Sequence, residues 1–336
     1  MSTVAARLKH LLMPEAVSSQ AAWRRFWRET ALAYTFLLPA LVIIITFKLA
    51  PVFFAFYISL HRWSLVPERF VGLGNYVYLL HSEEFRRSLL ISVYYVVGAV
   101  PAEMVLGLLL AVLLFRSAWL QGLYRTGYFL PYVTSTLAAA VVWSWMYHPQ
   151  IGVINWMLKT LGLPTQRWMQ EETGVLRLLG EWLGIHVPVW AEGPSLAMFA
   201  IIVMTIWHYT GFHMVVFLAG LSTIPRELYD AARIDGASSW QLFRHITWPL
   251  LSPTTFFLFI VSTIGAFQAF NQIYQMAPPV GGPRGATTTA TIYIFKQFYV
   301  GGYVGRGSAA AFILFGIILA LTLLNFYILE RRVHYE

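Results

Sequence analysis

The chain contains six apolar stretches of about 20 residues or more, separated by polar segments that are often rich in Gly or Pro. About 20 apolar residues of helix cross the hydrocarbon core of a bilayer, so each stretch is predicted to be a membrane-spanning helix. No segment between them is large enough to fold as a separate soluble domain. The sequence therefore predicts an all-α, polytopic membrane protein. Its predicted spans cover residues 31–58, 88–115, 126–147, 196–220, 252–275 and 308–329.

The composition agrees with a protein whose surface largely faces lipid. Of the 336 residues, 58% are hydrophobic and only 11% are charged, whereas soluble domains carry about 25% charged residues. The 13 Trp residues are typical of side chains anchored at membrane interfaces. The formal net charge is +8, but the basic residues are scattered between apolar runs, which disfavours nucleic-acid binding. The absence of Cys excludes disulfides, thiolate catalysis and Cys-ligated metals.

Residues 1–30 are predicted to be a basic N-terminal tail, and residues 31–336 the transmembrane domain. The tail interleaves basic with apolar side chains, which fits either a segment on an anionic membrane surface or a partly disordered tail whose charges only set topology. Six spans place both termini on one side of the membrane. Because Arg24, Arg25 and Arg28 directly precede the first span, the positive-inside rule predicts cytoplasmic termini and a location in the cell membrane.

Two ionisable residues fall within predicted spans, where a buried charge is costly and marks a functional site by default. Lys48 lies near the end of the first span, so its side chain can extend to the interface without any special role. Glu103 follows Pro101 in the second span and is a candidate for a cavity or a subunit interface.

Residues 148–195 form the longest loop and repeat apolar side chains at near-helical spacing. This pattern predicts an amphipathic helix on the outer face. The helix would either rest on the membrane or dock an external partner. Its apolar residues are Val175, Leu176, Leu178, Leu179, Trp182, Leu183 and Ile185.

The chain lacks the motifs of common catalytic sites. There is no G-x-x-x-x-G-K-[ST] loop for ATP phosphates, no H-E-x-x-H and no G-x-S-x-G. His208 and His213 share a span but differ by five positions, which places them about 140° apart on a helix. The sequence therefore predicts no metal site, no bound cofactor and no enzymatic activity in this chain.

Residues 221–250, between the fourth and fifth spans, are patterned too regularly for a linker. Pro225 can open a short helix, and Glu227 lies near its positive end. Gly236 permits the positive φ needed to reverse the chain before a second helix runs toward Pro249. A compact helix–turn–helix bearing both charge signs beneath a membrane bundle is suited to docking into a cytoplasmic partner.

This segment resembles the cytoplasmic EAA loop in the permease subunits of ATP-binding-cassette (ABC) importers. The family pattern is E-A-A, three residues, G, nine residues and I-x-L-P, and its elements stand here at Asp230-Ala231-Ala232, Gly236, Ile246 and Pro249. Asp230 replaces Glu, and Trp248 stands where Leu is usual. The resemblance implies that the loop couples transport to ATP hydrolysis by a partner. The implied coupling residues are Glu227, Asp230, Ala231, Ala232, Arg233, Asp235, Gly236, Ile246 and Pro249.

Further segments are similar to the maltose-permease-like branch of the carbohydrate uptake family, which imports oligosaccharides and glycerol phosphates. They are Phe70-Val71-Gly72-Leu73-Gly74-Asn75-Tyr76, Leu130-Pro131-Tyr132 at the opening of the third span, Gly281-Gly282-Pro283 and the closing Arg332-Val333-His334-Tyr335-Glu336. The resemblance implies a sugar-like solute, which is an oligosaccharide, a disaccharide or a glycerol phosphate. It also implies a second permease subunit, two ATPase subunits that bind ATP and Mg, and an extracytoplasmic solute-binding protein.

Two other transport functions are consistent with parts of the sequence. An ABC permease for a non-sugar solute would share the coupling loop. A proton-coupled secondary carrier that uses Glu103 or Lys48 would predict inverted repeats. The sequence shows no such repeats, and a carrier of this kind leaves the coupling loop unexplained.

Sugars offer hydroxyls for hydrogen bonds and flat C–H faces that pack on aromatic rings, so their sites mix polar and aromatic side chains. At mid-membrane depth such side chains are expected to face the bundle interior. Tyr132 and Thr136 are expected on one face of a single helix. Helix–helix contact through polar side chains is the alternative interpretation. On these grounds and by alignment with maltose-type permeases, the predicted cavity residues are Tyr132, Thr136, Thr205, His208, Tyr209, Phe212, Ser262, Gln268, Asn271 and Gln272.

Overall fold

The structure is a computed structural model that describes residues 20–64, 66–116 and 121–329. Most of the predicted basic tail and the closing segment 332–336 lie outside the described residues. The chain divides into two units, Met1–Tyr57 and Ile58–Glu336, which are described separately.

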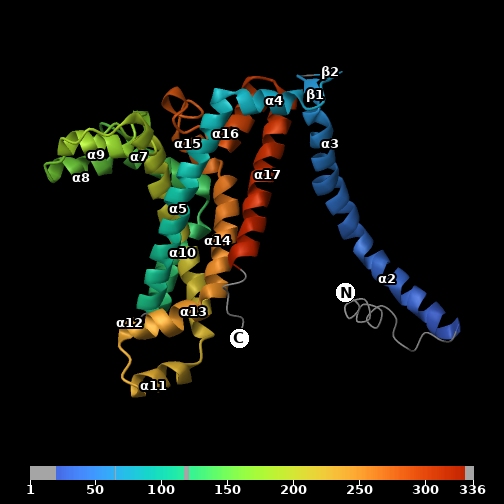
Figure 1. Ribbon diagram of the computed structural model, residues 1–336, viewed down its shortest axis with the longest axis horizontal. Helices are drawn as coiled ribbons and strands as arrows, with labels where there is room; N and C mark the ends of the chain where they lie inside the picture. Colours follow the sequence, from blue (N-terminus) through green and yellow to red (C-terminus); the bar gives the residue numbers. More distant parts are fainter. Residues whose placement is uncertain (1–19, 65, 117–120, 330–336) are drawn as a thin grey trace. The chain divides into compact units, whose positions relative to one another are not determined.

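In the first unit, one helical run passes through α2, the π-helical turn η1 and most of α3 (Figure 1). Almost all of its described side chains are exposed, and most of them are apolar, so they require lipid or another chain around them. The run contains the predicted span 31–58 but begins 11 residues earlier, at Gln20, so the described part of the predicted tail is helical. The bounds are α2 (Gln20–Ile44), η1 (Ile45–Leu49) and α3 (Ala50–Ser59).

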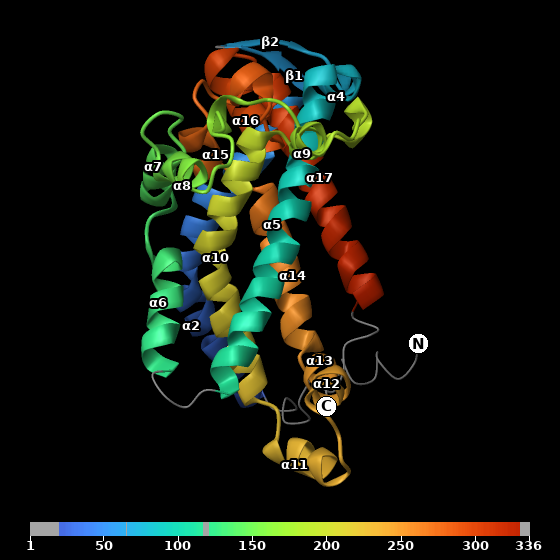
Figure 2. The same cartoon turned by 90° about the vertical axis from the view of Figure 1, so that its left-hand side faces the viewer.

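The second unit is built on three long helices, α5, α10 and α14, which lie side by side (Figures 1 and 2). The pair α5 and α10 has the most extensive contact, because Gly107 lets the two backbones approach closely. A Cβ at position 107 would meet the His213 Cβ at 2.5 Å and the Met214 backbone N at 3.0 Å. A fourth long helix, α17, packs on α14, α16 and α4. The bounds are α4 (Gly74–His81), α5 (Glu83–Arg116), α10 (Leu196–Ser222), α14 (Ser252–Phe267), α16 (Ala290–Phe295) and α17 (Val304–Leu329).

Short elements cover the two ends of this unit. A two-stranded antiparallel hairpin, α4 and the helices of the 148–195 loop lie at one end, and α11 to α13 lie at the opposite end (Figure 2). At the first end the bounds are β1 (His61–Trp63), β2 (Pro67–Phe70), α8 (Val153–Thr160), η2 (Trp168–Gln170), α9 (Val175–Leu183), η3 (Val189–Ala191), α15 (Asn271–Met276), η5 (Pro283–Gly285) and η6 (Lys296–Val300). At the opposite end they are α11 (Arg226–Ile234), α12 (Ser239–Leu242), η4 (Phe243–Thr247) and α13 (Trp248–Leu250).

The predicted third span, 126–147, is broken rather than continuous. It consists of α6 (Gln121–Val133) and α7 (Thr136–Met146), whose axes differ by 93°. The break follows Pro131, and the hydroxyl of Thr134 donates to the Pro131 carbonyl at 2.6 Å, which caps the end of α6. Leu130-Pro131-Tyr132 therefore lies at the end of a helix, and its predicted place at the opening of a span is wrong.

The predicted fifth span, 252–275, is also interrupted, because α14 ends at Phe267 and α15 begins only at Asn271. Before α14, the run Ser239–Leu250 meets it at 62°. Among the described residues, four helices are long and apolar enough to cross a membrane, and the number rises to six if each bent pair is one span. The all-helical, multi-span fold class is confirmed.

The amphipathic helix predicted within 148–195 is present as α9. Leu176, Leu179 and Trp182 expose about half or more of their surface, while Gly180 is buried against Val187. Ile185 lies beyond the end of the helix, which Gly184 terminates at φ +72°.

Candidate solute cavity and coupling loop

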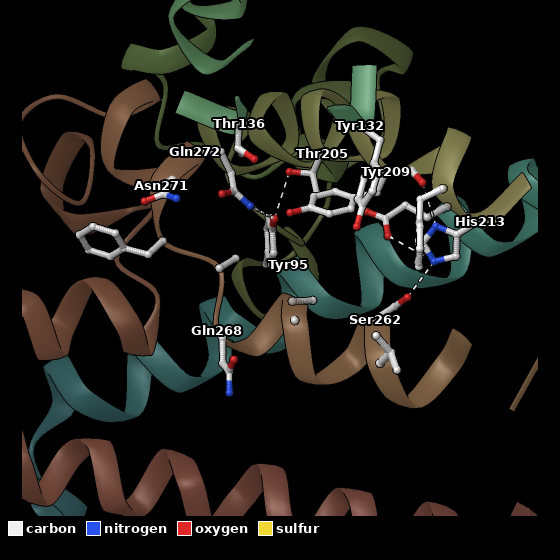
Figure 3. A pocket seen from close by; sticks show the side chains of 17 residues that line it. Tyr95, Tyr132, Thr136, Thr205, Tyr209, His213, Ser262, Gln268, Asn271 and Gln272 are labelled. Atoms are coloured by element: carbon white, nitrogen blue, oxygen red, sulfur yellow. Dashed lines mark hydrogen bonds and ion pairs between the residues drawn. The ribbon is translucent and has the colours of Figure 1, made fainter. Parts of the chain in front are cut away.

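A cavity of about 370 Å³ opens among α5, α6, α7, α10, α14 and α15 (Figure 3). Its size is within the range of small-molecule sites. Of the ten residues predicted to line the cavity, His208 alone is not in the lining. It is buried next to the cavity, and its Nε2 shares a hydrogen bond of 3.1 Å with the Thr136 hydroxyl. Nine of the ten predicted cavity residues line it: Tyr132, Thr136, Thr205, Tyr209, Phe212, Ser262, Gln268, Asn271 and Gln272.

Aromatic rings form one wall of the cavity. Tyr132 stacks on Phe212 with ring centroids 4.8 Å apart and an interplanar angle of 23°. The ring of Tyr209 meets Tyr132 edge-on at 5.9 Å. These rings come together because α6 touches α10 at Gly211, where any side chain would overlap the Tyr128 carbonyl. The result is a flat apolar surface of the kind on which the C–H face of a sugar ring packs.

A chain of hydrogen bonds holds another part of the cavity lining. The side-chain amide of Gln272 donates to the Tyr95 hydroxyl at 2.7 Å, and that hydroxyl lies 3.0 Å from the Thr205 hydroxyl. All three side chains are at least 96% buried. Because they come from α15, α5 and α10, the network fixes the short helix α15 against the two long ones.

Two other amides of the lining are not engaged in this way. Gln268 caps the end of α14 and Asn271 begins α15, and both residues are exposed and line the cavity. Within the described part of the chain, neither side chain makes a hydrogen bond. Helix–helix contact therefore accounts for Gln272 and Thr205 but not for these two amides, which remain available to a solute.

The predicted placement of Tyr132 and Thr136 on one face of a single helix is wrong, because the break at Thr134 and Ser135 separates them. Both line the cavity nevertheless, since the 93° bend turns α7 over the end of α6.

Eight further residues line the cavity. Glu103 was a candidate for a cavity or a subunit interface, and the seven that were not predicted are Tyr95, His213, Val261, Gly265, Ala266, Ala269 and Phe270. Glu103 carried a signal, since it is an ionisable residue inside a predicted span. Tyr95 carried none, because it lies in a uniformly apolar stretch and acquires its role only from Thr205 and Gln272, 110 and 177 residues away in the sequence.

A group of polar side chains around Glu103 joins α5, α10 and α14. The carboxylate Oε2 of Glu103 lies 4.0 Å from the His213 Nε2, and the same nitrogen is 2.7 Å from the Ser262 hydroxyl. The Nδ1 of His213 is 3.0 Å from the Tyr209 carbonyl, so its N–H donates to that oxygen.

The second candidate site is the helix–turn–helix at the far end of the unit. As predicted, α11 and the run α12–η4–α13 are joined through Gly236, which has φ +81°. The helix starts one residue later than Pro225, which is its N-cap. The Tyr229 and Thr247 hydroxyls, 3.0 Å apart, tie α11 to η4, and Ser238 with Gln241 forms a capping box at the start of α12.

The predicted coupling residues divide by exposure. Six of them are exposed: Glu227, Asp230, Ala231, Arg233, Asp235 and Gly236. The other three, Ala232, Ile246 and Pro249, are half-buried. Ala232 and Ile246 line a groove of about 270 Å³ between α11 and α12, together with the exposed Asp235 and Gly236. Asp230 pairs with Arg233 at 3.2 Å, and Ile234 is 87% exposed. The loop thus presents opposite charges beside an uncovered apolar side chain.

Contacts at the other end anchor the 148–195 loop. Arg284 donates to Glu172 at 2.7 Å, and the Ser195 hydroxyl donates to the Ala286 carbonyl at 3.2 Å. The hydroxyl and N–H of Thr173 both donate to Glu171 and hold the pKa of that carboxyl below its usual range. The loop is therefore fixed to residues 284–286, which directly follow Gly281-Gly282-Pro283.

Residues 103–335 match the family described as "Binding-protein-dependent transport system inner membrane component". This chain belongs to that family. It is thus a multi-pass membrane component of a transport system that depends on a binding protein.

Relatives of this inner membrane component cover it almost from end to end. The trehalose/maltose transport system permease protein MalF of Thermococcus litoralis is 35% identical over 88% of this chain and 93% of its own length. The lactose permease protein LacF of Rhizobium radiobacter is 31% identical over 93% of this chain and 96% of its own. The sn-glycerol-3-phosphate transport system permease protein UgpA of Agrobacterium fabrum is 31% identical over 90% of this chain and 96% of its own length.

The fold of this inner membrane component is also found in a solved structure. A chain of a bacterial ABC transporter involved in the import of the acidic polysaccharide alginate aligns with a TM-score of 0.76, covering 93% of this chain and 99% of the other. The sequence identity is 22%, so the similarity concerns the fold alone.

Proposed function

We propose that this chain is the permease subunit of an ABC importer that translocates a sugar-like solute delivered by an external binding protein. The cavity carries the proposal. It joins a stacked aromatic wall at Tyr132 and Phe212 to uncommitted amides at Gln268 and Asn271. Relatives named for trehalose, maltose and lactose transport support the same solute class.

The proposal includes the rest of the importer. A second permease subunit, two ATPase subunits and the binding protein would complete it, and ATP and Mg would bind to the ATPase subunits rather than to this chain. The exposed charges of α11 and the uncovered Ile234 support docking of this loop into an ATPase subunit. The exposed apolar surface of α2 and α3 requires lipid or the second permease subunit around it.

The solute role of the cavity is tested by removing its side chains singly. Tyr132→Ala, Tyr209→Ala and Gln268→Ala should each lower uptake by about tenfold, because each removes one stacking or hydrogen-bonding contact. Stimulation of the ATPase by the loaded binding protein should persist, since the coupling loop is untouched. Both quantities are measured with the importer in proteoliposomes.

The matched control is Tyr124→Ala, which removes an exposed ring from the same helix, α6, away from the cavity. Its uptake should equal that of the parent. If all three cavity variants also transport at the parental rate, the polar and aromatic side chains serve helix packing, and the cavity assignment fails.

The orientation is tested by labelling, because the chain has no cysteine to give a background. We expect both termini and the 221–250 loop to face the cytoplasm and the 148–195 loop to face outward. A thiol introduced by Ser238→Cys should react with a membrane-impermeant maleimide only after the membrane is opened. A thiol introduced by Lys159→Cys should react in intact cells, and the reverse pattern contradicts the topology.

A further inference from the structure

Of the described residues that line the cavity, one carries a carboxyl group. It is Glu103, which lies two residues after Pro101 on α5. Only 4% of the residue is exposed, yet it forms part of the cavity lining. No side chain in the described part of the chain donates a hydrogen bond to it, and the nearest basic group is the His213 Nε2 at 4.0 Å. The carboxyl oxygens of Glu103 can therefore still accept hydrogen bonds from a solute.

His213 does not act as a dedicated counter-ion. Its Nδ1–H donates to the Tyr209 carbonyl at 3.0 Å, and its Nε2 accepts from the Ser262 hydroxyl at 2.7 Å. These two partners satisfy a neutral imidazole completely, and this tautomer follows from the partners. The ring thus holds Ser262 and does not cancel a charge on the Glu103 carboxyl.

Among the residues that the structure describes, no Lys and no Arg lines the cavity. Apart from Glu103 and His213, its ionisable side chains are the phenols of Tyr95, Tyr132 and Tyr209. Taking an anion out of water without a cationic partner is very costly. An ionised Glu103 adds repulsion to that cost, and a protonated one supplies a hydrogen-bond donor but no positive charge.

We infer that the cavity selects uncharged, hydroxyl-rich solutes over anionic ones, and that Glu103 is the residue that sets this preference. The inference rests on the proposed function and narrows it, since it excludes glycerol phosphates and uronates from the part of the pathway that this chain supplies. Solute hydroxyls donate to the Glu103 carboxylate, while Gln268 and Asn271 complete the polar contacts and the Tyr132–Phe212 wall holds the ring face.

The charge of the cavity is measured with a thiol introduced by Ala266→Cys, which lies in the lining of a chain without other cysteines. The importer in nanodiscs is treated at about pH 8.5, where ordinary carboxyls are ionised, with cationic trimethylammonioethyl or anionic sulfonatoethyl methanethiosulfonate. Each rate is divided by the rate of the same reagent with free mercaptoethanol. The cationic reagent should be favoured by about tenfold, as expected for one nearby charge in a partly buried site.

The ratio should fall to near one when Glu103→Gln is combined with the same thiol. The control Glu84→Gln removes an exposed carboxyl on α5 that pairs with Lys296 outside the cavity, and it should leave the ratio unchanged. Two results would overturn the role of Glu103 in the charge of the cavity. One is a ratio near one in the Ala266→Cys chain that keeps Glu103, and the other is an equal ratio with Glu103 and with Gln at that position.

Protection of the same thiol reports on the solute. Without the binding protein, millimolar maltose should slow labelling, and glycerol phosphate at the same concentration should not. Equal protection by maltose and glycerol phosphate overturns the inferred selection against anions. The proposed function as an importer of sugar-like solutes would still stand. Protection by neither, together with the expected charge ratio, counts against the proposed carbohydrate function while supporting the selection against anions.

Discussion

Replacing Asp230 by Lys or Gly236 by Val is expected to abolish uptake while the chain still inserts and assembles. Asp230 is exposed on α11, and within the described part of the chain its one ionic partner is its neighbour Arg233. Its reversal should therefore leave the fold intact but place like charges against a docked partner. Gly236 sits at φ +81°, a conformation that a β-branched residue adopts only with strain. Mismatched charges at a desolvated interface cost several kcal/mol, so uptake should fall roughly 100-fold or more.

Two controls make this result specific to the loop. Glu181→Lys reverses an exposed charge on α9, at the opposite end of the unit, and uptake should be unaffected. Gly236→Asn changes the same position to a residue that tolerates a left-handed conformation, so much of the activity should return. Uptake is normalised to the amount of assembled complex for each variant. Normal uptake by both Asp230→Lys and Gly236→Val would contradict a role of this loop in coupling.

The continuous helices were predictable from the sequence because their apolar runs are uninterrupted. The predicted span 196–220 corresponds to α10 (Leu196–Ser222), and 308–329 lies within α17 (Val304–Leu329). The breaks were not predictable in the same way. Polar residues do mark both breaks, namely Thr134, Ser135 and Thr136 in one case and Gln268, Asn271 and Gln272 in the other. Such residues in a long apolar run equally indicate polar contacts inside a continuous membrane helix, so they do not by themselves predict a turn.

The coupling loop was predicted in more detail than the cavity, for a physical reason. Its turn depends on one local requirement, the positive φ at Gly236, which the sequence itself displays. The cavity depends on contacts between distant segments. Tyr95 meets Gln272 across 177 residues and His213 meets Ser262 across 49, and no periodicity in either segment marks the partner.

Gly211→Ala and Gly316→Ala make the same chemical change in two membrane helices and are expected to have opposite effects on stability. Helix propensity alone favours Ala over Gly by about 0.5–1 kcal/mol. At Gly316 on α17 the new Cβ meets no atom within 4 Å, so stability should be unchanged or slightly raised. At Gly211 the Cβ overlaps the Tyr128 carbonyl and the Phe129 backbone, which cannot rotate away.

The α6 backbone must therefore move in the Gly211→Ala variant, at a cost of about 3 kcal/mol, the upper part of the usual range for overpacking. Since α6 carries Tyr132, the same movement separates its ring from Phe212 and opens the aromatic wall of the cavity. Thermal unfolding of the detergent-solubilised protein should show a lower midpoint for Gly211→Ala than for the parent and an equal or higher one for Gly316→Ala. Equal midpoints for the two variants would mean that α6 does not pack against α10 at this glycine, and the cavity would then lack the contact that brings its aromatic wall together.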